Sequence, residues 1–116
     1  MKEFKLQPLR ICAGWKVAYN NFSEYDPEKD ESEYSYELYE DLLQLENNEL
    51  LIDLGWYPHG DLEGSYKLYM VNITFEAPFQ HPLEVFSSRS KTEILEKLEY
   101  WTNSGFYQKY IRRTVK

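Results

Sequence analysis

Cysteine is nearly absent from this sequence of 116 residues, because Cys12 is the only one. A single cysteine cannot form an intramolecular disulfide, and without a neighbouring base it is more often a small buried hydrophobe than a nucleophile. Long apolar runs are also missing, since no stretch approaches the roughly 18 residues that cross a bilayer. The first five residues lack the apolar segment of a signal peptide. We therefore expect a cytoplasmic protein without a membrane partner.

Histidine and glycine are scarce as well, with two histidines and five glycines. His59 and His81 lie in turn-like segments and neither has metal-ligand spacing from another donor, so we expect both to be surface loop residues. The glycines do not form a phosphate-binding loop, and the acidic stretch 24–31 lacks the glycine of a calcium loop. The sequence therefore predicts no metal, no cofactor and no enzyme activity.

Negative charge is in excess, because the net charge is −7. Between Glu24 and Asp53 there are twelve acidic residues and one basic residue, Lys29. The last ten residues are basic instead, through Lys109, Arg112, Arg113 and Lys116. Phosphate backbones are bound by lysine and arginine, so this balance argues against nucleic acid as a partner. A basic protein is the natural partner for such a chain.

Length and composition predict one α+β domain over residues 1–116, since 42% of the residues are hydrophobic and 17% aromatic. Residues 106–116 form a basic, aromatic tail for which strand, helix and disorder all stay open. The predicted elements are a strand within 10–22, a helix over 33–46, strands over 49–57 and 65–75, an edge strand over 83–87 and a helix over 90–102. We expect an antiparallel sheet of about four strands with both helices packed on one face.

Two of these predictions rest on strong patterns. Residues Leu50, Ile52, Leu54 and Trp56 alternate with residues of the opposite face, as in a central strand. Ser90 and Glu93 fit a capping box ahead of an apolar stripe that ends near Trp101. The helix over 33–46 rests on a looser apolar stripe, with Asn47 and Asn48 as its stop.

Tyrosines stand among the acidic residues of the first half of the chain. Tyrosine is enriched at binding hot spots, and clustered carboxylates speed association with a cationic partner. The same tyrosines could instead pack the predicted helix onto the sheet. The candidate partner-binding residues are Tyr25, Asp26, Glu28, Asp30, Glu31, Glu33, Tyr36, Glu37, Tyr39 and Glu40.

Three segments carry a family resemblance: residues 14–17 (GWKV), 52–58 (IDLGWYP) and 82–89 (PLEVFSSR), followed by a helix ending in Trp101. In these segments, and in size and charge, the chain resembles the immunity proteins of bacterial polymorphic-toxin systems. That resemblance implies an inhibitor that binds a cognate toxin domain, often a nuclease with a basic active site. The acidic cluster would then imitate the charge of the nucleic acid.

Two other hypotheses stay open. In the first, the chain is a homo-oligomeric structural or regulatory domain, such as a homodimer in which Arg112 and Arg113 of one subunit meet the acidic region of another. In the second, Trp15, Trp56 and Trp101 line a pocket of a small enzyme or ligand-binding domain. No activated nucleophile or acid/base pair accompanies these tryptophans, which counts against the second hypothesis.

Overall fold

The elements of the fold are defined in a computed structural model, which describes residues 2–111. The strands are β1 (Lys16–Asn20), β2 (Leu43–Asn47), β3 (Leu50–Tyr57), β4 (Ser65–Asn72) and β5 (Glu84–Ser88). The α-helices are α1 (Lys91–Trp101) and α2 (Ser104–Tyr107), and the 3-10 helices are η1 (Ser32–Glu37), η2 (Pro78–Gln80) and η3 (Gln108–Tyr110). The chain is a single α+β domain, as the sequence predicts.

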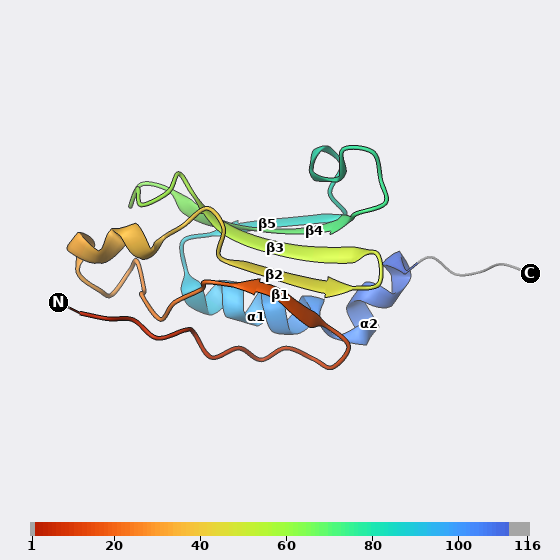
Figure 1. The fold of residues 1–116 in the computed structure, drawn as a ribbon, viewed down its shortest axis with the longest axis horizontal. Coiled ribbons are helices and arrows are strands. Elements are labelled where there is room, and N and C mark those ends of the chain that lie inside the picture. The colour runs from red at the N-terminus through yellow and green to blue at the C-terminus, as the bar shows by residue number, and fades with distance from the viewer. Residues whose placement is uncertain (1, 112–116) are drawn as a thin grey trace, which may run out of the picture.

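The strands form one antiparallel sheet in the order β1-β2-β3-β4-β5. Each strand pairs with its neighbour in the chain, so the sheet is a meander. Figure 1 shows the strands side by side with α1 behind them. The sheet has five strands, where the sequence predicts about four.

One face of the sheet is covered by α1 and holds the core. Leu50, Ile52, Leu54 and Trp56 of β3 are fully buried there, as their alternation predicts. Helix α1 contributes Ile94, Leu98 and Trp101 to the same core. Each of these side chains stabilises the fold by about 2 kcal/mol through burial of apolar surface.

The helix predicted over 33–46 is wrong, and β2 is the strand missing from the prediction. Residues 32–37 form only the short η1, and the chain then enters β2 at Leu43. Leu43 and Leu45 both face the core, and their spacing of two residues fits a strand. The same leucines also fit the looser apolar stripe of a helix, so the sequence pattern does not decide between the two. Asn48, with a φ of 55°, begins the hairpin turn to β3 and does not end a helix.

Helix α1 begins as predicted, with the Ser90 side chain accepting a hydrogen bond from the Glu93 amide at 3.2 Å. The return half of the capping box is different, because the Glu93 carboxylate accepts from the Ser88 hydroxyl at 2.5 Å. Glu93 therefore ties the helix to the end of β5. Only α1 is a long helix on the sheet, where the sequence predicts two.

A buried lysine at the start of α1 holds the N-terminal segment in place. Lys91 Nζ donates to the Ser23 carbonyl at 2.7 Å and to Gln7 Oε1 at 3.0 Å. The segment also pairs along its backbone with residues 22–24, which extends the line of β1. Burial lowers the pKa of Lys91 to about 8, although Asp26 and Asp30 oppose that shift.

The predicted tail begins inside the described structure. Residues 104–110 form α2 and η3, and Tyr107 packs edge-on against Trp15 with ring centroids 5.1 Å apart. The Tyr110 hydroxyl donates to the Glu84 carboxylate. Arg112, Arg113 and Lys116, on which the homo-oligomer hypothesis depends, lie outside the described residues.

Candidate functional site

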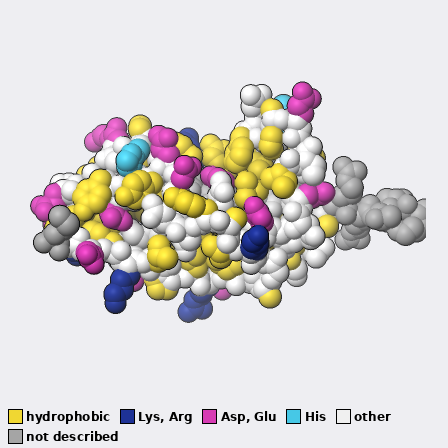
Figure 2. Space-filling model, viewed as in Figure 1, with side chains coloured by type: hydrophobic (Ala, Val, Ile, Leu, Met, Phe, Trp, Pro, Cys, Tyr) yellow, Lys and Arg dark blue, Asp and Glu magenta, His cyan; other side chains and the backbone are white. Residues whose placement is uncertain are grey.

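All ten predicted binding residues lie at one end of the molecule. We call it the acidic end and define it as residues 24–41. Figure 1 shows this segment, with η1, projecting beyond the sheet on the side of the N-terminus. Asp26 shapes its first turn by accepting from the Glu28 amide at 2.9 Å, while its own amide donates to Asp30 Oδ2 at 2.8 Å. In Figure 2 several acidic side chains gather at this end.

The structure divides the predicted residues by exposure. The exposed ones are Glu28, Glu31, Glu33, Tyr36 and Glu40. The partly buried ones are Asp26, Asp30, Glu37 and Tyr39. Tyr25 is buried instead, because its ring packs against Phe4 at 5.4 Å and its hydroxyl donates to the Glu31 carbonyl at 3.1 Å. Tyr25 therefore supports the fold, and the predicted tyrosines that reach solvent are Tyr36, which is 46% exposed, and Tyr39.

Few of these carboxylates are neutralised by neighbours. Within residues 2–111 the ion pairs run from Lys2 to Asp30 at 3.7 Å and to Glu31 at 3.8 Å. Both pairs are at least partly open to solvent, where such pairs are weak. The acidic end therefore presents a field of negative charge to the solvent.

A second surface, which the sequence analysis does not single out, is the face of the sheet opposite α1. We call it the open face. Directly paired residues in neighbouring strands point to the same side, so the registers place one row of side chains across all five strands. That row is Tyr19, Gln44, Asp53, Tyr69 and Val85. Tyr19 is 44% exposed and Val85 is 52% exposed, and Figure 2 looks onto this side of the sheet.

Asp53 lies at the centre of the row and is only 7% exposed. Its Oδ2 accepts a hydrogen bond from Gln44 Nε2 at 2.8 Å. Burial raises the pKa of the Asp53 carboxyl, with a further contribution from Asp41, while the Gln44 bond opposes the rise. An ionised carboxylate in this position has a neutral partner and a like-charged neighbour.

Tyr57 joins this group from the end of β3. Its ring lies over Gly55, where a Cβ would stand 2.9 Å from the tyrosine ring and 1.9 Å from the Glu40 carbonyl oxygen. Burial raises the pKa of Tyr57 to about 12, and the next largest causes are Asp53 and Asp41. Because Gly55 has no side chain, the Tyr57 phenol and the acidic end can approach the centre of the sheet.

The acidic end and the open face meet at two adjacent hollows. One, of about 430 Å³, is lined by Tyr19, Tyr39, Glu40, Asp41 and His59. The other, of about 390 Å³, shares Tyr19 and Asp41 and reaches Gln44 in the row. The His59 ring stacks on Tyr39 with centroids 5.1 Å apart and so forms one side of this junction. Together these surfaces offer aromatic area and carboxylates to a partner.

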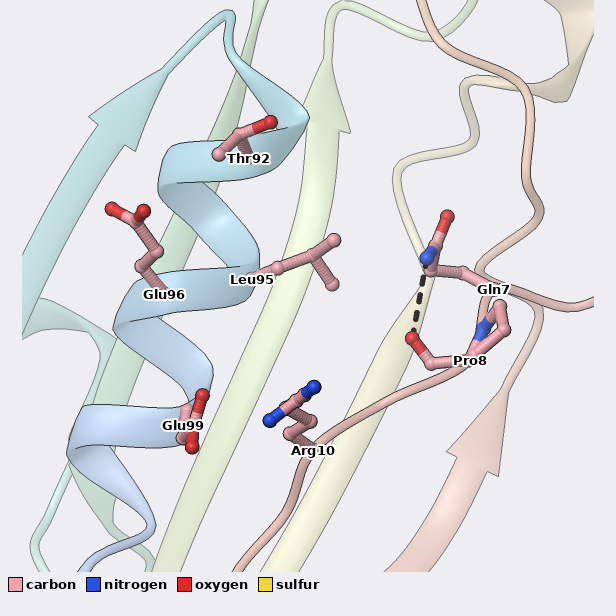
Figure 3. Close-up of a pocket in the computed structure, with 7 residues that line it drawn as sticks. All are labelled: Gln7, Pro8, Arg10, Thr92, Leu95, Glu96 and Glu99. Carbon is pink, nitrogen blue, oxygen red and sulfur yellow. Dashed lines mark hydrogen bonds between the residues drawn. The ribbon is translucent and has the colours of Figure 1, made fainter.

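Another groove of about 340 Å³ lies between the N-terminal segment and α1. Its lining residues are Gln7, Pro8, Arg10, Thr92, Leu95, Glu96 and Glu99. Figure 3 shows Leu95 pointing from α1 toward the N-terminal segment, where Gln7 Nε2 donates to the Pro8 carbonyl at 3.2 Å. The groove contains none of the predicted binding residues and no nucleophile beside a base.

The other candidate residues are placed as follows. Both histidines are exposed in loops, as predicted. Cys12 is partly buried, not in a strand, and its amide donates to Thr102 Oγ1 at 3.2 Å. Trp56 and Trp101 are in the core, so the three tryptophans do not line a pocket together.

Over residues 2–111 no group of three or more histidine, cysteine or acidic side chains is arranged to hold a metal ion. In the same range, no helix has the length and apolar character needed to cross a membrane. Comparison with protein-family models, with curated proteins and with solved structures finds no match.

Proposed function

We propose that this chain is a non-enzymatic binding protein that neutralises a basic protein partner by covering the partner's cationic surface. The immunity proteins that it resembles act on cognate toxins in this way, and a nuclease toxin would present such a surface. The observation that supports the proposal most directly is the acidic end, where exposed carboxylates stand beside Tyr36 and Tyr39 with only Lys2 as an ion-pair partner among the described residues.

The physical basis is electrostatic steering followed by contact through rigid aromatic rings. A concentrated field of one sign raises the association rate with an oppositely charged protein, by about 10-fold to 1,000-fold at low salt. Tyrosine then provides contact area at little cost in side-chain entropy. The rings of Tyr36 and Tyr39 are held by neighbours, since Tyr36 contacts Tyr34 and Tyr39 stacks on His59.

The experiment starts by finding the partner and then tests neutralisation. Tagged protein is used for capture from the native host at low and high salt, and each captured basic protein is expressed and purified. We expect one of them to be toxic to cells when expressed alone and harmless when this chain is co-expressed. If the purified candidates show no loss of toxicity or activity with this chain, the proposed function is wrong.

The surface is tested with two triple charge reversals of equal size. The first changes Glu28, Asp30 and Glu37 to lysine within the acidic end. The control changes three acidic residues outside it, Glu76, Glu96 and Glu99, all of which are exposed. The acidic-end variant should associate with the partner at least about 10-fold more slowly at low salt, and the control less than about 3-fold. Equal losses in both variants would show that only net charge matters.

A further inference from the structure

Strand β5 forms one edge of the sheet, at the opposite side from β1 (Figure 1). It pairs with β4, and within residues 2–111 no other segment pairs with its outer side. The edge at β1 is interrupted by a register shift between Val17 and Tyr19, and such irregularities hinder edge-to-edge pairing. Strand β5 has a regular register and contains no proline or lysine. Its edge is therefore able to accept another strand.

The hydrogen-bond pattern shows which backbone groups of β5 point outward. The Ile73 amide donates to the Glu49 carbonyl at 2.9 Å, where β4 ends beside β3. Hydrogen-bonded residues alternate along an antiparallel strand, so β4 uses its odd-numbered residues for β3 and its even-numbered residues for β5. The β5 residues in the second set of pairs are Glu84, Phe86 and Ser88. Val85 and Ser87 therefore carry the outward N–H and C=O groups.

Exposed apolar side chains flank this edge on both faces of the sheet. Val85 is 52% exposed on the open face. On the α1 side, a hollow of about 330 Å³ is lined by Phe86, Glu93, Glu96, Lys97 and Tyr100. Tyr100 is 57% exposed there, and Lys97 Nζ lies 4.9 Å from the centre of the Phe86 ring. A strand added to β5 would place alternate side chains beside Val85 and over this hollow.

We propose that β5 pairs in antiparallel orientation with β5 of a second copy of this chain, so that one sheet runs continuously through a homodimer. An antiparallel pair of identical strands has a two-fold axis, and each copy contributes the same surface. The register centred on Phe86 pairs all five residues of both strands. In this register Val85 lies opposite the partner's Ser87, and the outward backbone groups of the two residues exchange hydrogen bonds.

This inference does not depend on the proposed function. The residues at the β5 edge and on α1 lie outside the acidic end in the sequence. The proposed dimer therefore leaves the carboxylates of residues 24–41 available to a basic partner in each copy.

Charge complementarity favours a second copy as the occupant of this edge. Glu96 and Lys97 line the hollow, and neither forms an ion pair within residues 2–111. The two-fold axis sets this face of α1 against the same face of the second helix, running in the opposite direction. Lys97 of each copy then approaches the partner's Glu96. Within the strands, Glu84 lies opposite the partner's Ser88, so no like charges face each other.

Sedimentation velocity at a series of protein concentrations measures the association, and hydrogen exchange followed by NMR locates it. We expect a monomer–dimer equilibrium. In the dimer the backbone amides of Val85 and Ser87 should exchange at least about 10-fold more slowly than in the monomer. A protein that stays monomeric up to about 1 mM, or a dimer in which these two amides gain no protection, would overturn the inference.

A matched pair of variants at one position tests pairing through the strand. Ser87→Pro removes an N–H that does not bond to β4, and proline is tolerated at such an edge position. This variant should weaken dimerisation at least about 10-fold, whereas Ser87→Ala, which keeps the N–H, should weaken it less than about 2-fold. Denaturant unfolding checks that the proline variant is folded. Equal dimerisation by the two folded variants would refute pairing through β5.

The contacts of α1 are tested without altering the strand, which keeps the inference testable if the proline variant unfolds. Lys97→Glu and Glu96→Lys each place like charges across the axis, so each should weaken dimerisation about 10-fold. An equimolar mixture of these two variants should associate about as well as the original protein, because one copy then presents carboxylates where the other presents ammonium groups. A mixture that associates no better than either variant alone would refute the two-fold arrangement.

Discussion

Lys91 gives the fold a distinctive dependence on pH. Its Nζ is buried between Ser23 and Gln7, and burial lowers its pKa to about 8, from the value near 10.5 that applies to the unfolded chain. Between these two pH values the unfolded chain binds a proton that the folded chain has lost. Raising the pH through this window therefore increases the free energy of unfolding.

The magnitude follows from the size of that shift. Each pKa unit corresponds to about 1.4 kcal/mol, so the rise between about pH 7.5 and about pH 9.5 has a ceiling of about 2 kcal/mol. Partial solvent screening of the ammonium lowers the expected rise to about 1 kcal/mol. Above about pH 10 the trend should reverse. The pKa values of Tyr57 and Tyr110 are both raised to about 12 in the folded protein. Above about pH 10 the unfolded chain therefore loses these phenol protons first, and the free energy of unfolding falls.

The assay is denaturant unfolding followed by tryptophan fluorescence at a series of pH values. The original protein should become more stable up to about pH 10, and Lys91→Met should lose that rise because it has no titrating group at this position. Lys97→Met, a partly exposed position of the same helix, should keep it. Unfolding energies that stay flat or fall over this range in the original protein, or a rise that persists in Lys91→Met, would refute the reasoning.

Two other predictions concern the fold. Gly55→Ala places a Cβ 1.9 Å from the backbone oxygen of Glu40, so it should lower the free energy of unfolding by about 3 kcal/mol in denaturant titration. Gly105→Ala, whose added carbon meets only one side-chain oxygen at 3.0 Å, should cost less than about 1 kcal/mol, and equal losses would contradict the clash. Ser90→Ala removes the cap of α1 and should lower the melting temperature through a loss of about 1 kcal/mol. Ser87→Ala, on the exposed side of β5, should leave the melting temperature nearly unchanged. A similar loss in the Ser90→Ala and Ser87→Ala variants would argue against the cap.

The strongest local patterns of the sequence correspond to real elements. The alternation of Leu50, Ile52, Leu54 and Trp56 predicts a strand with one buried face, and β3 has that face. The cap at Ser90 predicts the start of α1. These predictions hold because a repeat of two residues or a side-chain cap is decided within one segment.

The stretch 33–46 shows where local pattern fails. Its leucines fit a helix and a strand, and the choice was made by partners outside the stretch, in the next strand of the chain. Leu43 and Leu45 pair with Leu54 and Ile52 of β3, and these pairs bury both sets of side chains. Burial against a neighbouring strand therefore outweighed local helix propensity.

The sequence by itself determined the class of fold, the excess of negative charge and its concentration in residues 24–53, because composition and charge do not depend on folding. Only the tertiary structure decided which of those residues act together. It placed Tyr25 in the interior, and it aligned Tyr19, Asp53 and Val85, far apart in the chain, in one row on the open face. Strand register creates such a row, and register is set by the packing of the whole sheet on α1, not by any single segment.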